Sequence, residues 1–361
     1  MSIFAFFPTF YEDELTYSLF ARYHVKSGNT HYSDTAKELF GRTMVNYETE
    51  FIDTLTQEAL EQITKNVPME EVVREHTMFN QYARFIPREQ RIKAFSSLCD
   101  MKGNYSDLLH IQQKTDTLYL RYCPICCQND REQFGETYWH RKHQLRGIGI
   151  CPIHHCKLHS SNVNTYRASN LGIIPAEFVA TDETVEMVDN EVEIALAEYL
   201  LNLFNLPISL ENEVSIGAFL HSKLEYTKYL CPRGNVRKLN LLFEDIREYY
   251  NGANDENTKW DNGKMGIFSR HHLDKIFNSK KFDIFSICQL GMFLGINPTA
   301  FIDMKLPLVS QKELFDGKVM ELHSQGIGCN RIGKMLGVSS KTVRNVYAEV
   351  EKWTYSCLSA I

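Results

Sequence analysis

Hydrophobic residues recur at helical spacing along most of the chain. Near the N-terminus, Leu15, Leu19 and Tyr23 form an i, i+4, i+8 stripe, which predicts a helix over residues 13–27. A second short helix is predicted over residues 33–40, with Gly41 just past its end, and helical patterns continue to about residue 113. The first two helices fit either a helix-turn-helix or an ordinary helical hairpin, and the pattern leaves both open.

The composition and the hydrophobic pattern of the sequence change near residue 118. A strand-like run, 118–122, leads into a stretch rich in Cys, His, Pro and Gly that ends near Ser160. Helical patterns return over 192–203 and continue to about residue 302, with a loop predicted over 251–266. The expected fold is therefore mainly α, a multi-domain helical protein with a small zinc-ribbon-like module and helix-turn-helix elements. The expected domains are an N-terminal helical domain (1–115), the zinc module (116–161), a helical middle domain (162–305) and a C-terminal helix-turn-helix (306–361).

The C-terminal segment 319–350 has the pattern of three short helices separated by sharp turns. Gly326 and Gly337 stand where tight turns require a left-handed backbone, and Ser339 is a natural N-cap for the last helix. That helix is expected to bury Val343, Tyr347 and Val350. Its exposed N-terminal half would then resemble a recognition helix that contacts phosphates and base edges. The predicted DNA-binding residues there are Ser340, Lys341, Thr342, Arg344 and Asn345. The alternative is a small helical bundle that binds protein.

The strongest chemical signal is a pair of matching knuckles. Cys123-Pro-Ile-Cys126 is followed about two dozen residues later by Cys151-Pro-Ile-His154. Three thiolates and one imidazole suit tetrahedral zinc and leave no open position for a catalytic water. The sequence therefore predicts one structural Zn²⁺ held by Cys123, Cys126, Cys151 and His154.

The module contains further cysteines and histidines. Cys127 is expected to point away from the metal, and Cys156 and His159 have no convincing partner pair for a second ion. His140 and His143 fit two interpretations, as packing groups around Trp139 or as phosphate contacts together with neighbouring cations. The cations proposed to contact DNA are Arg141, Lys142 and Arg146.

Composition and charge limit the functions that the chain can have. The chain has 361 residues, is 43% hydrophobic and carries a net charge of −6, with basic stretches that are local rather than general. Local fields decide phosphate attraction, so the acidic total excludes only a protein that coats DNA non-specifically. Five of the ten cysteines lie between Cys123 and Cys156, which indicates metal binding in a reducing compartment. We therefore expect a cytoplasmic protein, associated with the nucleoid when bound, with no membrane contact, no signal peptide and no ATP-binding P-loop.

Several blocks of the sequence resemble the TnsD/TniQ family of transposon target-site selection proteins. The N-terminal residues Phe6-Phe7-Pro8, the run Ala21-Arg22-Tyr23-His24 and the phrase His76-Thr77-Met78-Phe79 are similar to family blocks. The stretch from Cys123 to His154 resembles the family's zinc region. The similarity is expected to extend to about residue 302, on the TnsD-like branch. The chain is shorter than many TnsD-type proteins, so it is expected to be a short member or to have an incomplete DNA-reading part.

The resemblance implies a function. It implies a non-enzymatic, sequence-specific DNA-binding protein that selects an attachment site on double-stranded DNA. It also implies recruitment of a TnsC-like AAA+ ATPase, which in turn calls in the transposase. The alternatives are a TniQ-like adaptor in an RNA-guided transposition complex, a zinc-dependent nuclease, or a transcriptional repressor that uses only the terminal helix-turn-helix.

Overall fold

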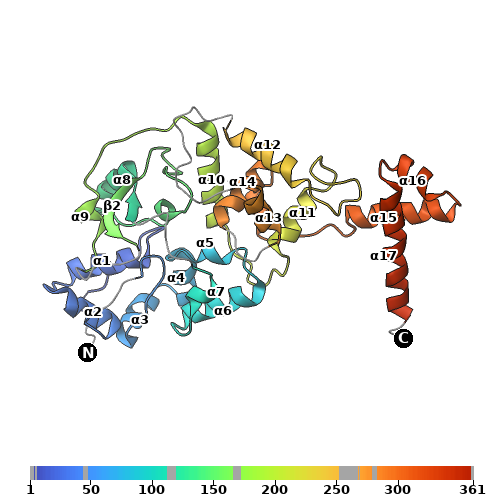
Figure 1. Cartoon of the computed structure of the whole chain (residues 1–361). Helices are drawn as coiled ribbons and strands as arrows, with labels where there is room; N and C mark the ends of the chain where they lie inside the picture. The colour runs from blue at the N-terminus through green and yellow to red at the C-terminus, as the bar shows by residue number, and fades with distance from the viewer. Residues whose placement is uncertain are drawn as a thin grey trace.

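The fold is predominantly helical, as the sequence predicts. The computed structural model describes residues 4, 6–43, 48–111, 119–165, 172–251, 267, 269–278 and 283–358. Of the predicted loop 251–266, residues 252–266 lie outside the described residues. Figure 1 shows a helical body that includes the N-terminal end, and a separate group of helices at the C-terminal end. The helices are α1 Thr16–Lys26, α2 Tyr32–Phe40, α3 Gln57–Thr64, α4 Met69–Glu75, α5 Phe79–Ala83, α6 Arg88–Cys99, α7 Tyr105–Leu108, α8 Pro124–Phe134, α9 Ala176–Val179, α10 Glu191–Asn205, α11 Ile216–Lys223, α12 Leu239–Asn251, α13 Arg270–Asn278, α14 Ile284–Phe293, α15 Gln311–Ser324, α16 Cys329–Met335 and α17 Ser340–Leu358, with short 3-10 turns at Lys142–Gln144 and Pro298–Phe301.

One continuous hydrophobic core holds the body together. It runs from Phe4 to Met304 and includes Trp139, which is fully buried. This core crosses the domain boundaries expected near residues 116 and 162 and stops near the one expected at 306. The four-part division remains a prediction.

The chain segment before α1 joins three parts of the body. The Leu15 amide donates to the carbonyl of Trp139 at 3.0 Å, and the Thr16 amide donates to that of His76 at 2.9 Å. The Arg141 amide donates to the Asp13 carbonyl at 2.9 Å. Residues 13–16 are therefore bonded on both sides, because an extended segment satisfies its backbone groups only with neighbours. The first eight of the eleven residues of α1 are buried.

A two-stranded sheet marks the entrance to the metal-binding region. Strand β1 (Tyr119–Tyr122) pairs antiparallel with β2 (His159–Asn164), with Tyr122 opposite His159. Buried Arg121 lies on β1 and donates to the carbonyls of Leu145 and Ile148. The sheet thus closes the loop that contains both knuckles.

The three C-terminal helices have a core of their own. Its fully buried members include Val319, Leu322, Ile332 and Val343. Gly326 and Gly337 have φ of 77° and 66°, and the Ser339 hydroxyl accepts from the Thr342 amide at 3.2 Å, as the sequence predicts.

The buried face of α17 is shifted from the predicted one. Val343 and Val346 are fully buried, whereas Tyr347 and Val350 are half-buried. Position 346 lies three residues after Val343 and therefore on the same helical face. A Cβ at Gly333 would lie 2.8 Å from the Val338 carbonyl oxygen, so α16 and the turn before α17 approach closely at this glycine.

A buried arginine fastens this bundle to the body. Arg233 donates to both carboxylate oxygens of Asp316 on α15, at 2.7 and 2.8 Å, and to Glu349 on α17, at 2.6 and 3.0 Å. Gln311 accepts from the Tyr226 amide at 2.8 Å and donates to the Pro232 carbonyl at 2.9 Å. The contact between the two cores is therefore polar, carried by a few charge-assisted hydrogen bonds.

A buried histidine makes the fold sensitive to acid. His76 is 7% exposed, Phe10 stacks on its ring, and its Nδ1 lies 2.8 Å from the carbonyl oxygen of Glu14. Burial lowers the pKa of His76 from 6.5 to about 4, because the imidazolium form is poorly solvated there. In the unfolded chain this group takes up its proton near pH 6.5. The stability it contributes is therefore present above pH 6.5 and is lost as the pH falls toward 4.

We predict that His76→Asn, which keeps a hydrogen-bond donor but does not titrate, reduces the loss of stability on acidification. Between pH 7 and pH 4, the wild type should lose up to about 3 kcal/mol more of its free energy of unfolding than the variant. Denaturant unfolding across this pH range measures the difference. His271→Asn, at an exposed position of α13, is the control and should leave the pH profile unchanged. Parallel wild-type and His76→Asn profiles would contradict the prediction.

Candidate metal centre and nucleic-acid interface

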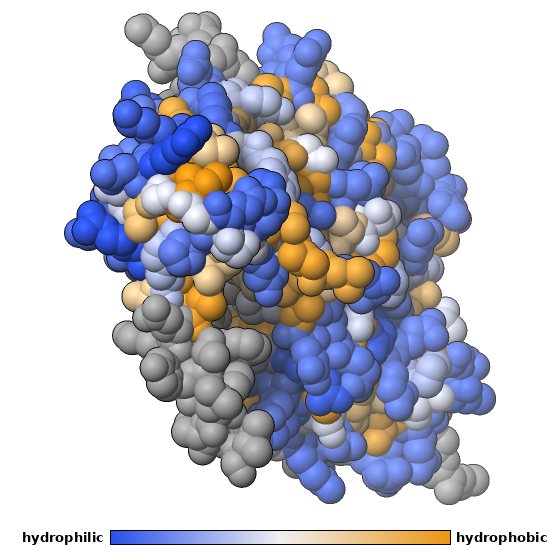
Figure 2. Space-filling model, turned by 90° about the vertical axis from the view of Figure 1, so that its right-hand side faces the viewer, coloured by the Kyte–Doolittle hydropathy of each residue, from blue (hydrophilic) through white to orange (hydrophobic). Residues whose placement is uncertain are grey.

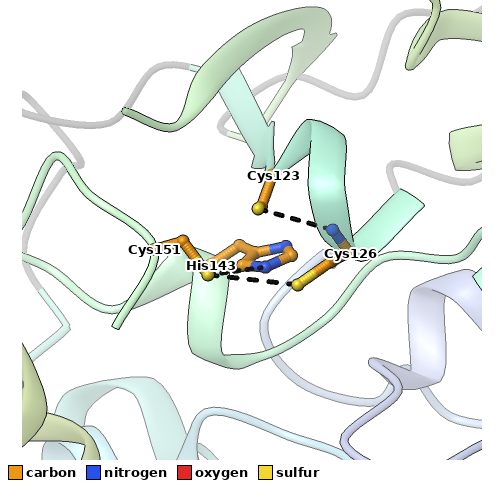
Figure 3. A group of neighbouring side chains, drawn as sticks. All are labelled: Cys123, Cys126, His143 and Cys151. Carbon is orange, nitrogen blue, oxygen red and sulfur yellow. Dashed lines mark hydrogen bonds between the residues drawn. The ribbon is translucent and has the colours of Figure 1, made fainter. Parts of the chain in front are cut away.

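The first knuckle is built into the start of α8. Cys123 is the N-cap of this helix, Pro124 occupies its first turn, and the Cys126 amide donates to the Cys123 sulfur at 3.4 Å. A proline fits the first turn because its missing N–H has no helical partner there. The helix start therefore holds the two sulfurs on one side (Figure 3).

The second knuckle is a tight turn over residues 151–156. The His155 amide donates to the Cys151 carbonyl at 2.9 Å, the Cys151 amide donates to the Cys156 carbonyl at 2.7 Å, and His155 has a positive φ of 55°. The turn places the Cys151 sulfur 3.9 Å from that of Cys126. It also buries Cys156, whose sulfur lies 3.4 Å from that of Cys123.

Two histidines compete for the fourth ligand position. His154 Nδ1 lies 3.5, 3.3 and 3.7 Å from the sulfurs of Cys123, Cys126 and Cys151. His143 Nε2 lies 3.9 Å from Cys151 and within 4.8 Å of the other two sulfurs. Tetrahedral zinc with Zn–S near 2.3 Å and Zn–N near 2.0 Å implies S–N edges of about 3.6 Å and S–S edges of about 3.8 Å. The distances from His154 match these edges more closely, and either histidine completes a Cys₃His set.

The chemistry of this donor set fits zinc. The three cysteines are buried, and their mutual hydrogen bonds lower the pKa of the Cys123 thiol while they raise that of Cys126, so this group shares its protons. A thiolate is the form that binds a metal. Four such donors close the coordination sphere, so the site can stabilise a fold but offers no position for an activated water.

A hydrogen-bonded layer surrounds the cluster. His140 Nε2 lies 2.8 Å from the Asp130 carboxylate, which also accepts from the Thr137 hydroxyl at 2.8 Å. The rings of His140 and His143 lie 4.8 Å apart, and both are buried. These contacts agree with the packing interpretation of the two histidines.

Two members of this region were not predicted from the sequence, namely Asp130 and Cys156, whose sulfur joins the same cluster. The sequence does indicate that Asp130 lies near the cluster, because residue 130 follows Cys126 by four positions on a helix and therefore shares its face. Cys127 points away from the cluster, as expected, and packs in the main core.

Two of the three predicted DNA-contacting cations of this module, Arg141 and Arg146, have internal partners for their guanidinium groups. Arg141 is 3% exposed and donates to Asp13 at 3.1 Å and to the carbonyl oxygens of Arg74 and Thr77. The Lys142 amide donates to Asp13 at 3.1 Å. The Arg146 guanidinium lies over the Tyr82 ring and 3.9 Å from Glu50. These groups hold the body together, and Arg141 in particular is directed away from solvent.

The predicted recognition residues lie instead on one open stretch of α17. Lys341, Arg344 and Asn345 are exposed, while Ser340 and Thr342 are half-exposed. The Arg344 side chain bends back along its own helix, where its Nε donates to the Ser340 carbonyl oxygen at 3.4 Å. Between them, Val343 and Val346 face the bundle core, so the polar residues are turned outward together.

A helical body built around a cysteine–histidine cluster, with a helix-turn-helix bundle fastened to it, defines a class of modular helical proteins whose buried Cys₃His group could hold a metal ion. Residues 5–158, somewhat less than half of the chain, match the family model described as TniQ, so this part of the chain is similar to the TniQ family. The match includes both knuckles.

A stretch of 154 residues is also 30% identical to the transposon Tn7 transposition protein TnsD of Escherichia coli. This similarity covers 41% of the chain and 30% of that protein, so it extends over less than the 302 residues expected from the sequence. Within the described residues, no helix is both long enough and apolar enough to span a bilayer.

We predict that the purified protein holds one zinc ion per chain and that His154→Ala loses it to a competing chelator before the wild type does. His143→Ala should keep one zinc, with affinity lower by about 10- to 100-fold, the usual effect of losing a group beside the ligands. Elemental analysis and a chromogenic chelator measure both.

Cys127→Ala is the matched control, since it removes a neighbouring thiol that faces the core, and it should retain zinc. The opposite order, with His143→Ala metal-free and His154→Ala loaded, would make His143 the fourth ligand.

Proposed function

We propose that this chain is a non-enzymatic target selector of a transposon, which binds an attachment site on double-stranded DNA and recruits an AAA+ ATPase of the TnsC type. The observation that carries the proposal is the coexistence of a TniQ-like region with an outward-facing recognition helix in one chain. The similarity to a Tn7 transposition protein supports the transposition role.

The recognition surface has the chemistry that DNA binding requires. Lys341 and Arg344 lie near the N-terminal half of α17, where helix-turn-helix proteins approach the major groove. Asn345 beside them carries the amide that pairs with adenine edges. Figure 2 looks onto the C-terminal end of the molecule, where hydrophilic side chains cover most of the surface and apolar ones gather across its middle. DNA contact is thus assigned to the C-terminal helices, since Arg141 is buried and Arg146 has internal partners.

The same features argue for a direct binder over the other candidates. The Cys₃His set leaves no open metal position for a nuclease, and His140 is engaged by a buried carboxylate. An adaptor guided by RNA would not need an exposed recognition helix. A simple repressor would not need the TniQ-like region.

We predict that Lys341→Ala weakens DNA binding uniformly across sequences and lowers the slope of log K against log salt by about one. Arg344→Ala should weaken binding and, where the side chain reaches a base, relax the sequence preference at one position. Selection from a random duplex library, followed by fluorescence anisotropy at several salt concentrations, measures these effects.

Arg247→Ala, an exposed cation on α12, is the matched control and should leave the affinity and the salt slope unchanged. If Lys341→Ala and Arg344→Ala bind the selected DNA as tightly as the wild type does, the assignment of α17 as the recognition helix is wrong.

A further inference from the structure

A three-row ladder of backbone hydrogen bonds extends outward from the second knuckle. In the inner pair, the Cys151 amide donates to the Cys156 carbonyl and the Leu158 amide to the Gly149 carbonyl, at 2.7 and 2.8 Å. In the outer pair, the Lys157 amide donates to the Glu186 carbonyl and the Val188 amide to the His155 carbonyl, both at 2.9 Å. Residues 186–188 therefore form the outermost row.

The outer edge of this row is open. Backbone groups alternate in direction along an extended segment, so those of Val185 and Met187 point away from the ladder. Their amides have no hydrogen-bond acceptor among the residues that the structure describes. Their side chains are 46% and 60% exposed and, two positions apart, share one face.

This edge has no lysine or proline to discourage pairing with another chain. Proteins blunt exposed edges with lysine, proline or a covering element, because unpaired amides template pairing with another chain. Residues 181–193 contain no proline, lysine or arginine and carry six acidic side chains, at positions 182, 183, 186, 189, 191 and 193. Of these, Glu186 pairs with Lys157 and Asp182 with His159. Glu183, between them, is exposed.

We infer that the open edge at residues 183–187 is a docking surface for an extended segment of a partner protein in which lysine or arginine alternates with apolar residues. Main-chain hydrogen bonds would add the segment as a fourth row, Val185 and Met187 would contact its apolar side chains, and the acidic rim would pair with its cations. DNA would be repelled by this rim. A second copy of this chain would place like charges opposite one another, which disfavours pairing.

The location suits a recruiting surface. The helices α8 and α9 and the strand β2, which surround the knuckles, lie at the opposite end of the molecule from α15–α17 (Figure 1). DNA held by the recognition helix would therefore leave this edge free. This step of the inference rests on the proposed function. Under that function, the extended segment that docks on the edge belongs to the AAA+ ATPase.

The test uses the full-length protein and a labelled ten-residue peptide of alternating lysine and valine. Hydrogen exchange should show that the Val185 and Met187 amides exchange quickly in the free protein and slow down when the peptide is added. A peptide of alternating lysine and proline, which cannot add to a sheet edge, should not slow them.

Two variants probe the edge, each with a matched control. Met187→Pro removes an outward amide and should weaken peptide binding by about tenfold, the size of one to two hydrogen bonds. Met187→Thr keeps the amide and the strand propensity and should retain most of the affinity. Glu183→Lys should weaken binding several-fold through charge alone, whereas Glu248→Lys on α12 should not.

The outcomes separate this inference from the proposed function. Peptide binding that is unchanged by Met187→Pro overturns the inference, as does a dimer of the wild type that Met187→Pro abolishes. An ATPase that binds the wild type and not Met187→Pro supports both the inference and the recruitment role. An ATPase that binds both equally overturns the edge as the recruiting surface. Peptide protection of the edge without any ATPase binding supports the edge and contradicts the recruitment role.

Discussion

The structure depends on how residues 137–146 are held between the cysteine–histidine cluster and the segment before α1. On one side, His143 and the knuckle cysteines fix this stretch to α8. On the other side, Trp139 and Arg141 exchange backbone hydrogen bonds with residues 13–15. The buried guanidinium of Arg141 adds bonds to Asp13 and to carbonyls near His76. A buried charge of this kind is tolerated only where its partners are complete.

This arrangement explains why a segment rich in cysteine and histidine, with little core of its own, can organise a large helical body. Zinc binding contributes directly to folding when the ligands come from an otherwise irregular segment. Here the two knuckles close a loop whose interior residues, Trp139 above all, belong to the main core. Disruption of the cysteine–histidine cluster would therefore release the anchor of α1 as well as the local turns.

The sequence was informative where short-range chemistry decides the structure and less so where long-range contacts do. The knuckles, the positive-φ glycines at 326 and 337, and the N-cap Ser339 follow from local rules, and each lies where it was expected. By contrast, Arg141 looked like a DNA contact because it stands in a basic run, and its burial depends on Asp13, 128 residues away along the chain. The choice between His143 and His154 likewise depends on how the chain returns to α8, which spacing alone does not specify.

The distribution of charge connects the two ends of the molecule. The net charge of −6 equals the charge that the six acidic residues of the segment 181–193 carry, so the rest of the chain is close to neutral overall. Because electrostatic fields are screened over about 8–10 Å, an acidic edge near the knuckles does not weaken a cationic face on α17 at the other end. One small protein can therefore present surfaces of opposite sign to two different partners. The polar contact of Arg233 with Asp316 and Glu349 then fixes the orientation of the cationic face relative to the acidic edge.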